Sequence, residues 1–147
     1  MSTETNKALV RNWLEAVDTG EVSVVEQFLD PGYVDHNPPP FPGLPPGIEG
    51  ARQAYVQGLA AFSDFHHEIE DQYADGDTVI SRIVGYGKHT GDFLGIPPTG
   101  KHVRMEGIAI HRIAGSKIVE HWAQIDAAGL LTQLGAIPPP GTAAPSR

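Results

Sequence analysis

The first third of the chain carries apolar residues at the three- and four-residue spacing of amphipathic helices. This spacing predicts one helix over residues 7–19, which Gly20 ends. The apolar stripe of a second, shorter helix consists of Val22, Val25, Phe28 and Leu29. The run D-P-G at residues 30–32 then ends that helix. A third helix is predicted over residues 50–62. The chain therefore begins with three short helices.

After the third helix the apolar pattern changes from a helical to an alternating period, which is typical of strands. Strands over residues 65–73 and 78–88 flank a D-G-D turn and form one predicted hairpin. Strands over residues 103–113 and 118–125 flank A-G-S and form a second. Helices and strands do not alternate in this region, so we expect an antiparallel sheet. The predicted fold class is α+β: a cone of three N-terminal helices packed on a curved antiparallel sheet that encloses a deep pocket.

A proline-rich segment separates the second and third helices. The run D-H-N at residues 35–37 leads into three consecutive prolines, and Pro42, Pro45 and Pro46 follow. Proline excludes helix interiors and central strands, so we expect an ordered loop that covers the mouth of the pocket. Asp35 and Asn37 have two possible roles. They either hydrogen-bond neighbouring backbone amides to hold the turn, or they contact a substrate.

The stretch K-I-V-E-H-W-A-Q-I-D-A-A-G-L-L-T-Q-L-G at residues 117–135 begins as a strand and ends as a helix, with Asp126 at the junction. Alternation gives one face of the strand to Ile118, Glu120, Trp122, Gln124 and Asp126. An aromatic ring, an amide and a carboxylate together are typical of a pocket lining. Asp126 is therefore the candidate catalytic group of the pocket. It could also cap the following helix, which lowers a carboxyl pKa, whereas an apolar pocket raises it.

Composition narrows the classes of function. The 147 residues predict one domain over residues 1–137 and a disordered tail over residues 138–147. A net charge of −8, without blocks of like charge, argues against nucleic-acid and anionic-membrane partners. The absence of cysteine excludes disulfides, thiolate chemistry and Cys-ligated zinc. Without a long apolar run or a secretory N-terminus, we expect a soluble cytoplasmic protein.

Seven histidines raise the question of a metal site. There is no H-E-x-x-H motif, and the adjacent His66 and His67 face opposite ways on a strand, so no metal is predicted. A site of two histidines and one carboxylate from distant positions stays open. The chain also lacks a phosphate-binding glycine loop and a G-x-S-x-G elbow. The remaining candidate chemistry is acid–base catalysis by carboxylate and histidine side chains.

His111 lies on the strand that precedes the one ending at Asp126. In the simplest hairpin, residue 111 pairs with a residue near 119–121, and Asp126 lies opposite residues 104–106. Either of two sets of residues forms the inward face of the strand that carries His111, because a bulge would exchange the inward and outward sets. One set is Met105, Gly107, Ala109 and His111. The other is Arg104, Glu106, Ile108, Ile110 and Arg112.

Several motifs of this chain resemble those of the SnoaL-like polyketide cyclases, an ester-cyclase group within the NTF2-like superfamily. They are G-K-H-T-G-D-F-L-G-I-P-P-T-G-K at residues 87–101, E-G-I-A-I-H-R-I at 106–113, the whole stretch at 117–135, D-H-N at 35–37 and G-I-E-G at 47–50. The resemblance implies a cone around one deep pocket, in a homo-oligomer (a dimer or a tetramer). It implies an intramolecular aldol condensation that closes the last ring of an aromatic polyketide methyl ester, without metal or cofactor.

The resemblance also implies roles for particular residues. The Asp of the W-x-x-x-D motif falls on Asp126 as the catalytic acid/base, and a catalytic pocket histidine falls on His111. The predicted substrate-binding residues are Asn37, His36, Trp122 and Gln124. One departure is Ala109, where we expect a polar pocket residue. The chemistry agrees with these residues, since one carboxylate suffices to remove a proton from carbon between two carbonyl groups.

Two other classes of function remain open. The first class is another acid–base enzyme with the same cone, such as an isomerase or an epoxide hydrolase. An epoxide hydrolase would need further charged groups in the pocket, for which Arg82, Arg104 and Glu106 are candidates. The other is a non-catalytic protein that binds a small hydrophobic molecule. An exposed Asp126 that only caps a helix would favour this second class.

Overall fold

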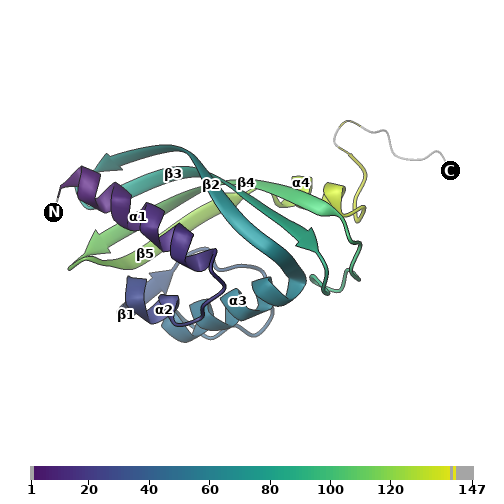
Figure 1. Cartoon of the computed structure of the whole chain (residues 1–147), viewed down its shortest axis with the longest axis horizontal. Helices are drawn as coiled ribbons and strands as arrows, with labels where there is room; N and C mark the ends of the chain where they lie inside the picture. Colours follow the sequence, from purple (N-terminus) through teal and green to yellow (C-terminus); the bar gives the residue numbers. More distant parts are fainter. Residues whose placement is uncertain (1, 140, 142–147) are drawn as a thin grey trace.

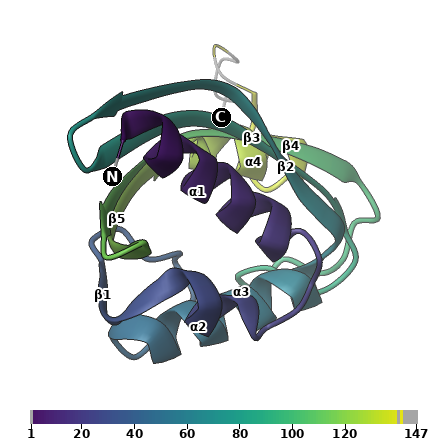
Figure 2. The same ribbon diagram turned by 60° about the vertical axis from the view of Figure 1, so that its left-hand side comes forward.

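The computed structural model describes residues 2–139 and 141. The described residues form α1 (Thr3–Val17), α2 (Val24–Phe28), β1 (Leu29–Asp35), α3 (Gly47–Ala61), β2 (Phe62–Asp75), β3 (Thr78–His89), β4 (His102–Ala114), β5 (Lys117–Ile125) and α4 (Ala127–Gln133). The five strands form one curved sheet, and α1, α2 and α3 lie on its concave side (Figures 1 and 2). The predicted α+β cone is confirmed. None of its described helices has the length and apolar character needed to cross a membrane.

The sheet is mixed, which corrects the expectation of a purely antiparallel one. Strands β2 to β5 pair antiparallel in chain order, but β1 joins the sheet beside β5 and runs parallel to it. The sequence pattern missed β1 because Pro31 and Gly32 lie inside it. Proline is tolerated there because β1 is an edge strand, and its register with β5 shifts between Leu29 and Val34. Leu29, assigned to a helix by its spacing, begins this strand.

The helix boundaries differ from the predicted ones by a few residues. Helix α1 begins at Thr3 because the hydroxyl of Ser2 accepts a hydrogen bond from the amide of Thr5 at 3.0 Å. Helix α3 begins at Gly47, directly after the proline-rich loop, and ends at Ala61. The predicted disordered tail, residues 138–147, lies mostly outside the described residues.

The pairing of β3, β4 and β5 decides which side of β4 faces inward. His111 pairs with His121 and Ala109 pairs with Ala123, and both His111 and Ala109 are buried. The set Met105, Gly107, Ala109 and His111 therefore faces the concave side. The other set lies on the outer, convex face, where Ile108 is 51% exposed.

Two core clusters fill opposite ends of the cone. The first core cluster joins α1, α2 and four strands through Val10, Val25, Leu29, Tyr33, Val79, Ile113 and Ile118. The second core cluster lies around the end of α3, the connector between β3 and β4, and α4. It consists of Ala61, Phe62, Phe93, Val103, Leu130 and Leu134.

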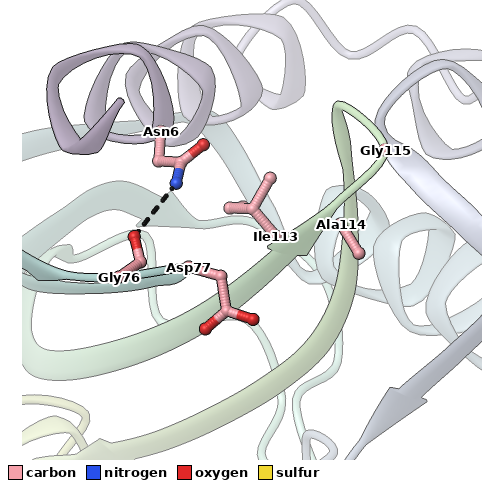
Figure 3. A pocket seen from close by; sticks show the side chains of 6 residues that line it. All are labelled: Asn6, Gly76, Asp77, Ile113, Ala114 and Gly115. Atoms are coloured by element: carbon pink, nitrogen blue, oxygen red, sulfur yellow. Dashed lines mark hydrogen bonds between the residues drawn. The ribbon is translucent and has the colours of Figure 1, made fainter. Parts of the chain in front are cut away.

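A small cavity of about 230 Å³ lies beside the first core cluster (Figure 3). Asn6, on α1, donates a hydrogen bond from Nδ2 to the carbonyl of Gly76 at 3.3 Å. This contact fastens the helix to the turn between β2 and β3. The other lining residues are Asp77, Ile113, Ala114 and Gly115. The cavity therefore belongs to the junction of α1 with the two hairpin turns.

Candidate active site

Asp126 is the first residue after β5. Its amide donates to the carbonyl of Glu106 at 2.8 Å, and its Oδ1 accepts a hydrogen bond from the amide of Gly129 at 2.8 Å. The carboxylate is thus the N-cap of α4, and the residue is exposed. A Cβ at position 129 would lie 2.2 Å from Oδ2 of Asp126, so any larger residue there would require this carboxylate to move. The capping contact is confirmed, and the acid/base role stays a prediction.

A second carboxylate lies on the concave side with two histidines and a tyrosine. We call Tyr33, Asp35, His111 and His121 the inner polar cluster. Nδ1 of His121 donates to Oδ1 of Asp35 at 3.0 Å, and this contact crosses from β5 to β1. The rings of His111 and His121 lie 4.9 Å apart, centroid to centroid. The cluster therefore joins three neighbouring strands, β1, β5 and β4.

Burial sets the charge of the inner polar cluster. It lowers the pKa of His111 to about 3, with a further contribution from the neighbouring His121. His111 is therefore neutral near pH 7. Its Nδ1 has no hydrogen-bond partner among the described residues. Burial, and then the charge of Asp35, raises the pKa of the Tyr33 hydroxyl well above its usual range. Neither His111 nor Tyr33 therefore carries a charge near pH 7.

A different polar group occupies the outer face at the same end of the sheet. We call His36, Glu120, Trp122 and Arg112 the outer cluster. The ring of His36 stacks on Trp122 at 4.5 Å, with 7° between the planes. Glu120 accepts hydrogen bonds from Nε2 of His36 at 2.8 Å and from Nε of Arg112 at 2.5 Å. These hydrogen bonds lower the pKa of Glu120 below its usual range, and the bond from His36 makes the largest contribution.

A bulge explains why Trp122 lies outside. The pairing of β4 with β5 shifts between Arg112 and Ile113, so that Ile118 faces the core while Glu120, Trp122 and Gln124 face outward. The expectation that Ile118 shares a face with these three residues is therefore wrong. Gln124 is exposed and pairs with Ile108 on the outer face.

The D-H-N run holds the turn at the end of β1. Oδ1 of Asp35 accepts a hydrogen bond from the amide of Asn37 at 3.0 Å. Oδ1 of Asn37 accepts one from the amide of Ala123 at 3.0 Å, which extends the pairing of β1 with β5 by one more bond. The turn-holding interpretation is confirmed for Asp35, whereas the side chain of Asn37 bonds an amide of the distant strand β5 instead of a neighbouring one. Contact of Asn37 with a substrate stays a prediction.

The predicted site residues thus fall into three places. His111 lies on the concave side, Asp126 at the exposed end of β5, and His36, Trp122 and Gln124 on or beside the outer face. The sequence argument did not assign Tyr33 or His121 to the site. A signal for His121 was present, because the simplest hairpin pairs residue 111 with residues 119–121, and the structure pairs it with His121. No such signal existed for Tyr33, since β1 was not recognised as a strand.

Small side chains connect the inner polar cluster with the end of β5. On the concave side Ala109 pairs with Ala123, and Gly107 pairs with Ile125 beside Asp126. Ile125 is 45% exposed although it lies on this concave side. The surface between His121 and Asp126 therefore opens toward solvent at the Asp126 end.

Charged groups expected in an epoxide hydrolase pocket are not on the concave side. Arg82 pairs with Asp71 at 2.5 Å, and Arg104 pairs with Glu106 at 3.1 Å, with all four side chains about half exposed. Nor do the described parts of the chain bring three or more histidines and carboxylates into a metal-binding group. These placements disfavour the epoxide hydrolase alternative.

A larger cavity of about 540 Å³ lies between the proline-rich loop, α3 and the connector that follows β3. Its lining residues are Phe41, Pro42, Gln57, Ala60, Asp92, Leu94 and Gly95. Neither this cavity nor the one beside Asn6 is lined by any of the predicted site residues.

Comparisons with known proteins agree with this geometry. Residues 7–134 match the family model of the SnoaL-like polyketide cyclases. The chain is 35% identical over 141 residues to the aklanonic acid methyl ester cyclase DnrD of Streptomyces peucetius, covering 92% of each chain. It is 32% identical over 127 residues to the nogalonic acid methyl ester cyclase of Streptomyces nogalater, covering 83% of this chain and 91% of the relative.

A solved structure shows the same architecture. TsrD from Streptomyces laurentii superimposes with a TM-score of 0.82 at 28% identity, over 93% of this chain and 99% of TsrD. The α+β cone is thus an NTF2-like fold. The chain belongs to the SnoaL-like polyketide cyclase family and is an enzyme of the polyketide cyclase type.

Proposed function

We propose that the protein closes a ring in a polyketide methyl ester by an intramolecular aldol reaction, with Asp126 as the acid/base and without a cofactor. The observation that carries this proposal is the likeness to methyl ester cyclases over nearly the whole chain, at 35% identity to DnrD. The carboxylate of Asp126 supports it further. This residue is exposed and directly follows Ile125, which lies on the concave side, so a substrate can reach its carboxylate.

The proposed reaction moves one proton and forms one bond. The carboxylate of Asp126 takes a proton from a carbon between two carbonyl groups, which leaves a delocalised enolate. The enolate carbon bonds to a second carbonyl carbon of the same molecule, and the electron pair of that C=O moves to its oxygen. Asp126 then returns its proton to this alkoxide. Substrate and product are isomers, so no leaving group or oxidant is needed.

The capping contact bears on the alternative of a non-catalytic binding protein. An exposed carboxylate that caps a helix has a structural role by itself, and this favours simple binding. The cap uses Oδ1 of Asp126 on a single amide, that of Gly129. A carboxylate offers more than one acceptor site, so the same group can hold the helix and still accept a proton.

The variant Asp126→Asn tests the proposal, because asparagine is as good an N-cap as aspartate but is not a base. We expect an unchanged fold and a loss of turnover of about 100-fold or more on a polyketide methyl ester. Ring closure and circular dichroism are measured together. Ser2→Asn, at the cap of α1, is the matched control and should keep full turnover. Full turnover by Asp126→Asn would exclude Asp126 as the base and favour another group.

We also infer that the protein forms a homo-oligomer through the outer face of the sheet. Ile80 and Ile108 are 38% and 51% exposed there, and ion pairs of Arg82 and Arg104 flank them. Ile108→Lys should dissociate the oligomer in light scattering after size-exclusion chromatography. Ile125→Lys is the control, since Ile125 is 45% exposed but lies on the concave side. A parent protein that is monomeric at micromolar concentration would contradict this inference.

A further inference from the structure

The inner polar cluster has no part in the proton transfer proposed for Asp126. His121 is 21% exposed in its side chain and Asp35 18%, so the pair is partly open. His111 beside them has an unpartnered Nδ1 among the described residues. A buried polar atom without a partner calls for an explanation, such as a bound polar ligand or water. The cluster therefore has unused hydrogen-bonding capacity on the concave side of the sheet.

The spacing along β5 sets the size of a ligand that could contact both places. Residues 121 and 126 lie about 16 Å apart along an extended strand, at about 3.3 Å per residue. A group at His121 therefore does not touch the atoms that react at Asp126. A ligand that reaches both is long and thin, as a linear set of fused rings with a side chain is.

The surface between the two places suits a flat ligand. Ala109 and Ala123 lie side by side there, followed by Gly107 with Ile125 beside it. The two alanines carry only methyl groups, which project little from the sheet, and Ala109 is 7% exposed. The exposed Ile125 supplies an apolar contact at the open end.

We propose that His121, oriented by Asp35, accepts a hydrogen bond from a phenolic hydroxyl on the distal ring of an aromatic polyketide, and so determines substrate specificity. This inference rests on the proposed function, because it takes the substrate class from there. Asp35 accepts the proton on Nδ1 of His121 at 3.0 Å. In the tautomer with its proton on Nδ1, His121 has its lone pair on Nε2, which makes this atom an acceptor for a hydroxyl group.

The alternative is that the pair only fastens the edge strand β1 to β5. A second histidine–aspartate pair in the chain is an example of a contact that only joins two elements. Asp18 accepts hydrogen bonds from both the amide and the Nδ1 of His67, at 2.9 and 2.6 Å, and so fixes the end of α1 to β2. The ring of His67 meets Phe65 edge-on at 4.9 Å, whereas that of His121 lies beside another imidazole. His67 therefore serves as the matched control.

The test compares binding of 2-hydroxyanthraquinone, whose hydroxyl is free to donate, and unsubstituted anthraquinone to the full chain, and it follows binding by the quenching of tryptophan fluorescence. We expect the parent protein to bind the hydroxylated probe about fivefold to tenfold more tightly, the value of one hydrogen bond. His121→Phe should bind both probes equally, and His67→Phe should keep the preference. No preference in the parent protein, or a preference retained by His121→Phe, would overturn the proposal.

A second measurement does not depend on the folding of a variant. In the parent protein with ¹⁵N-labelled histidine, the Nε2 resonance of His121 should shift on adding 2-hydroxyanthraquinone and stay unchanged with anthraquinone. Equal shifts with both probes would count against the hydrogen bond. Both measurements report binding and not turnover. Full turnover by Asp126→Asn with an intact preference in the parent protein would therefore count against the proposed base alone. Loss of turnover in that variant without any preference in the parent protein would count against the hydrogen bond to His121 alone.

Discussion

The inner polar cluster and the outer cluster pair the same kinds of groups on opposite faces of the same strands. On the inner side His121 contacts Asp35, and on the outer side His36 contacts Glu120. The two pairs are one residue apart on each strand, so the pleat alone separates them. Their neighbours differ more than the pairs do. The inner pair lies against the buried, neutral His111, and the outer pair lies against the half-exposed Arg112.

This difference shows that the role of a histidine–carboxylate contact depends on the residues around it. On the outer face, Arg112 stabilises the carboxylate of Glu120, and the ring of His36 stacks on Trp122. On the inner face, burial disfavours charge on His111 and leaves one of its ring nitrogens unpaired. Three predictions test this contrast.

The largest expected effect is acid destabilisation through His111. The folded pKa is about 3, below the ordinary value of 6.5, so between these pH values the unfolded chain binds a proton that the folded chain does not. His111 should thus make the fold less stable as the pH falls from 6.5 toward 3, by up to about 1.4 kcal/mol per unit. His111→Gln should flatten the dependence in urea unfolding at several pH values. His36→Gln is the control, and equal slopes for all three proteins would contradict the prediction.

The next effect comes from removing the inner carboxylate. Asp35→Ala leaves Nδ1 of His121 and the amide of Asn37 without their acceptor. We expect a loss of about 2–3 kcal/mol in the free energy of unfolding. A double-mutant cycle with His121→Ala should show coupling between the two side chains. Additive losses would mean that the contact contributes nothing of its own.

The smallest effect should follow from Glu120→Gln in the outer cluster. His36 and Arg112 lower the pKa of Glu120, whose side chain is 23% exposed. Glu120 therefore stabilises the fold above its usual pKa and loses this contribution as the pH falls. The loss of thermal stability at pH 7 should be smaller than for Asp35→Ala. It should also shrink at high salt, because screening weakens exposed ion pairs. A salt-independent loss as large as that of Asp35→Ala would remove the contrast between the faces.

Local patterns in the sequence predicted much of the fold. The turns D-G-D and A-G-S, with alternation on either side, were sufficient to place β2 to β5. The helical spacing of apolar residues gave α1 and α3 within a few residues. The cap at Asp126 was also foreseeable, since an aspartate precedes A-A-G-L-L.

The features that were missed depend on contacts between distant segments. Strand β1 pairs in parallel with a strand some ninety positions later in the chain, and Pro31 interrupts the local sequence pattern that would have predicted β1 as a strand. The bulge before Glu120 moved Trp122 to the outer face, and no local signal marks it. The inner polar cluster needs both features, so the sequence alone did not assemble it.

Strand β1 also limits how copies of the protein can associate. Pro31 has no amide hydrogen to offer to an added strand, and β1 is irregular in register. The opposite edge, β2, has two register shifts of its own, and Asp64 within it has a positive φ of 52°. Both margins of the sheet are therefore poor templates for cross-β growth. An oligomer formed through the outer face, as proposed above, would therefore not extend further by adding strands at the edges of the sheet.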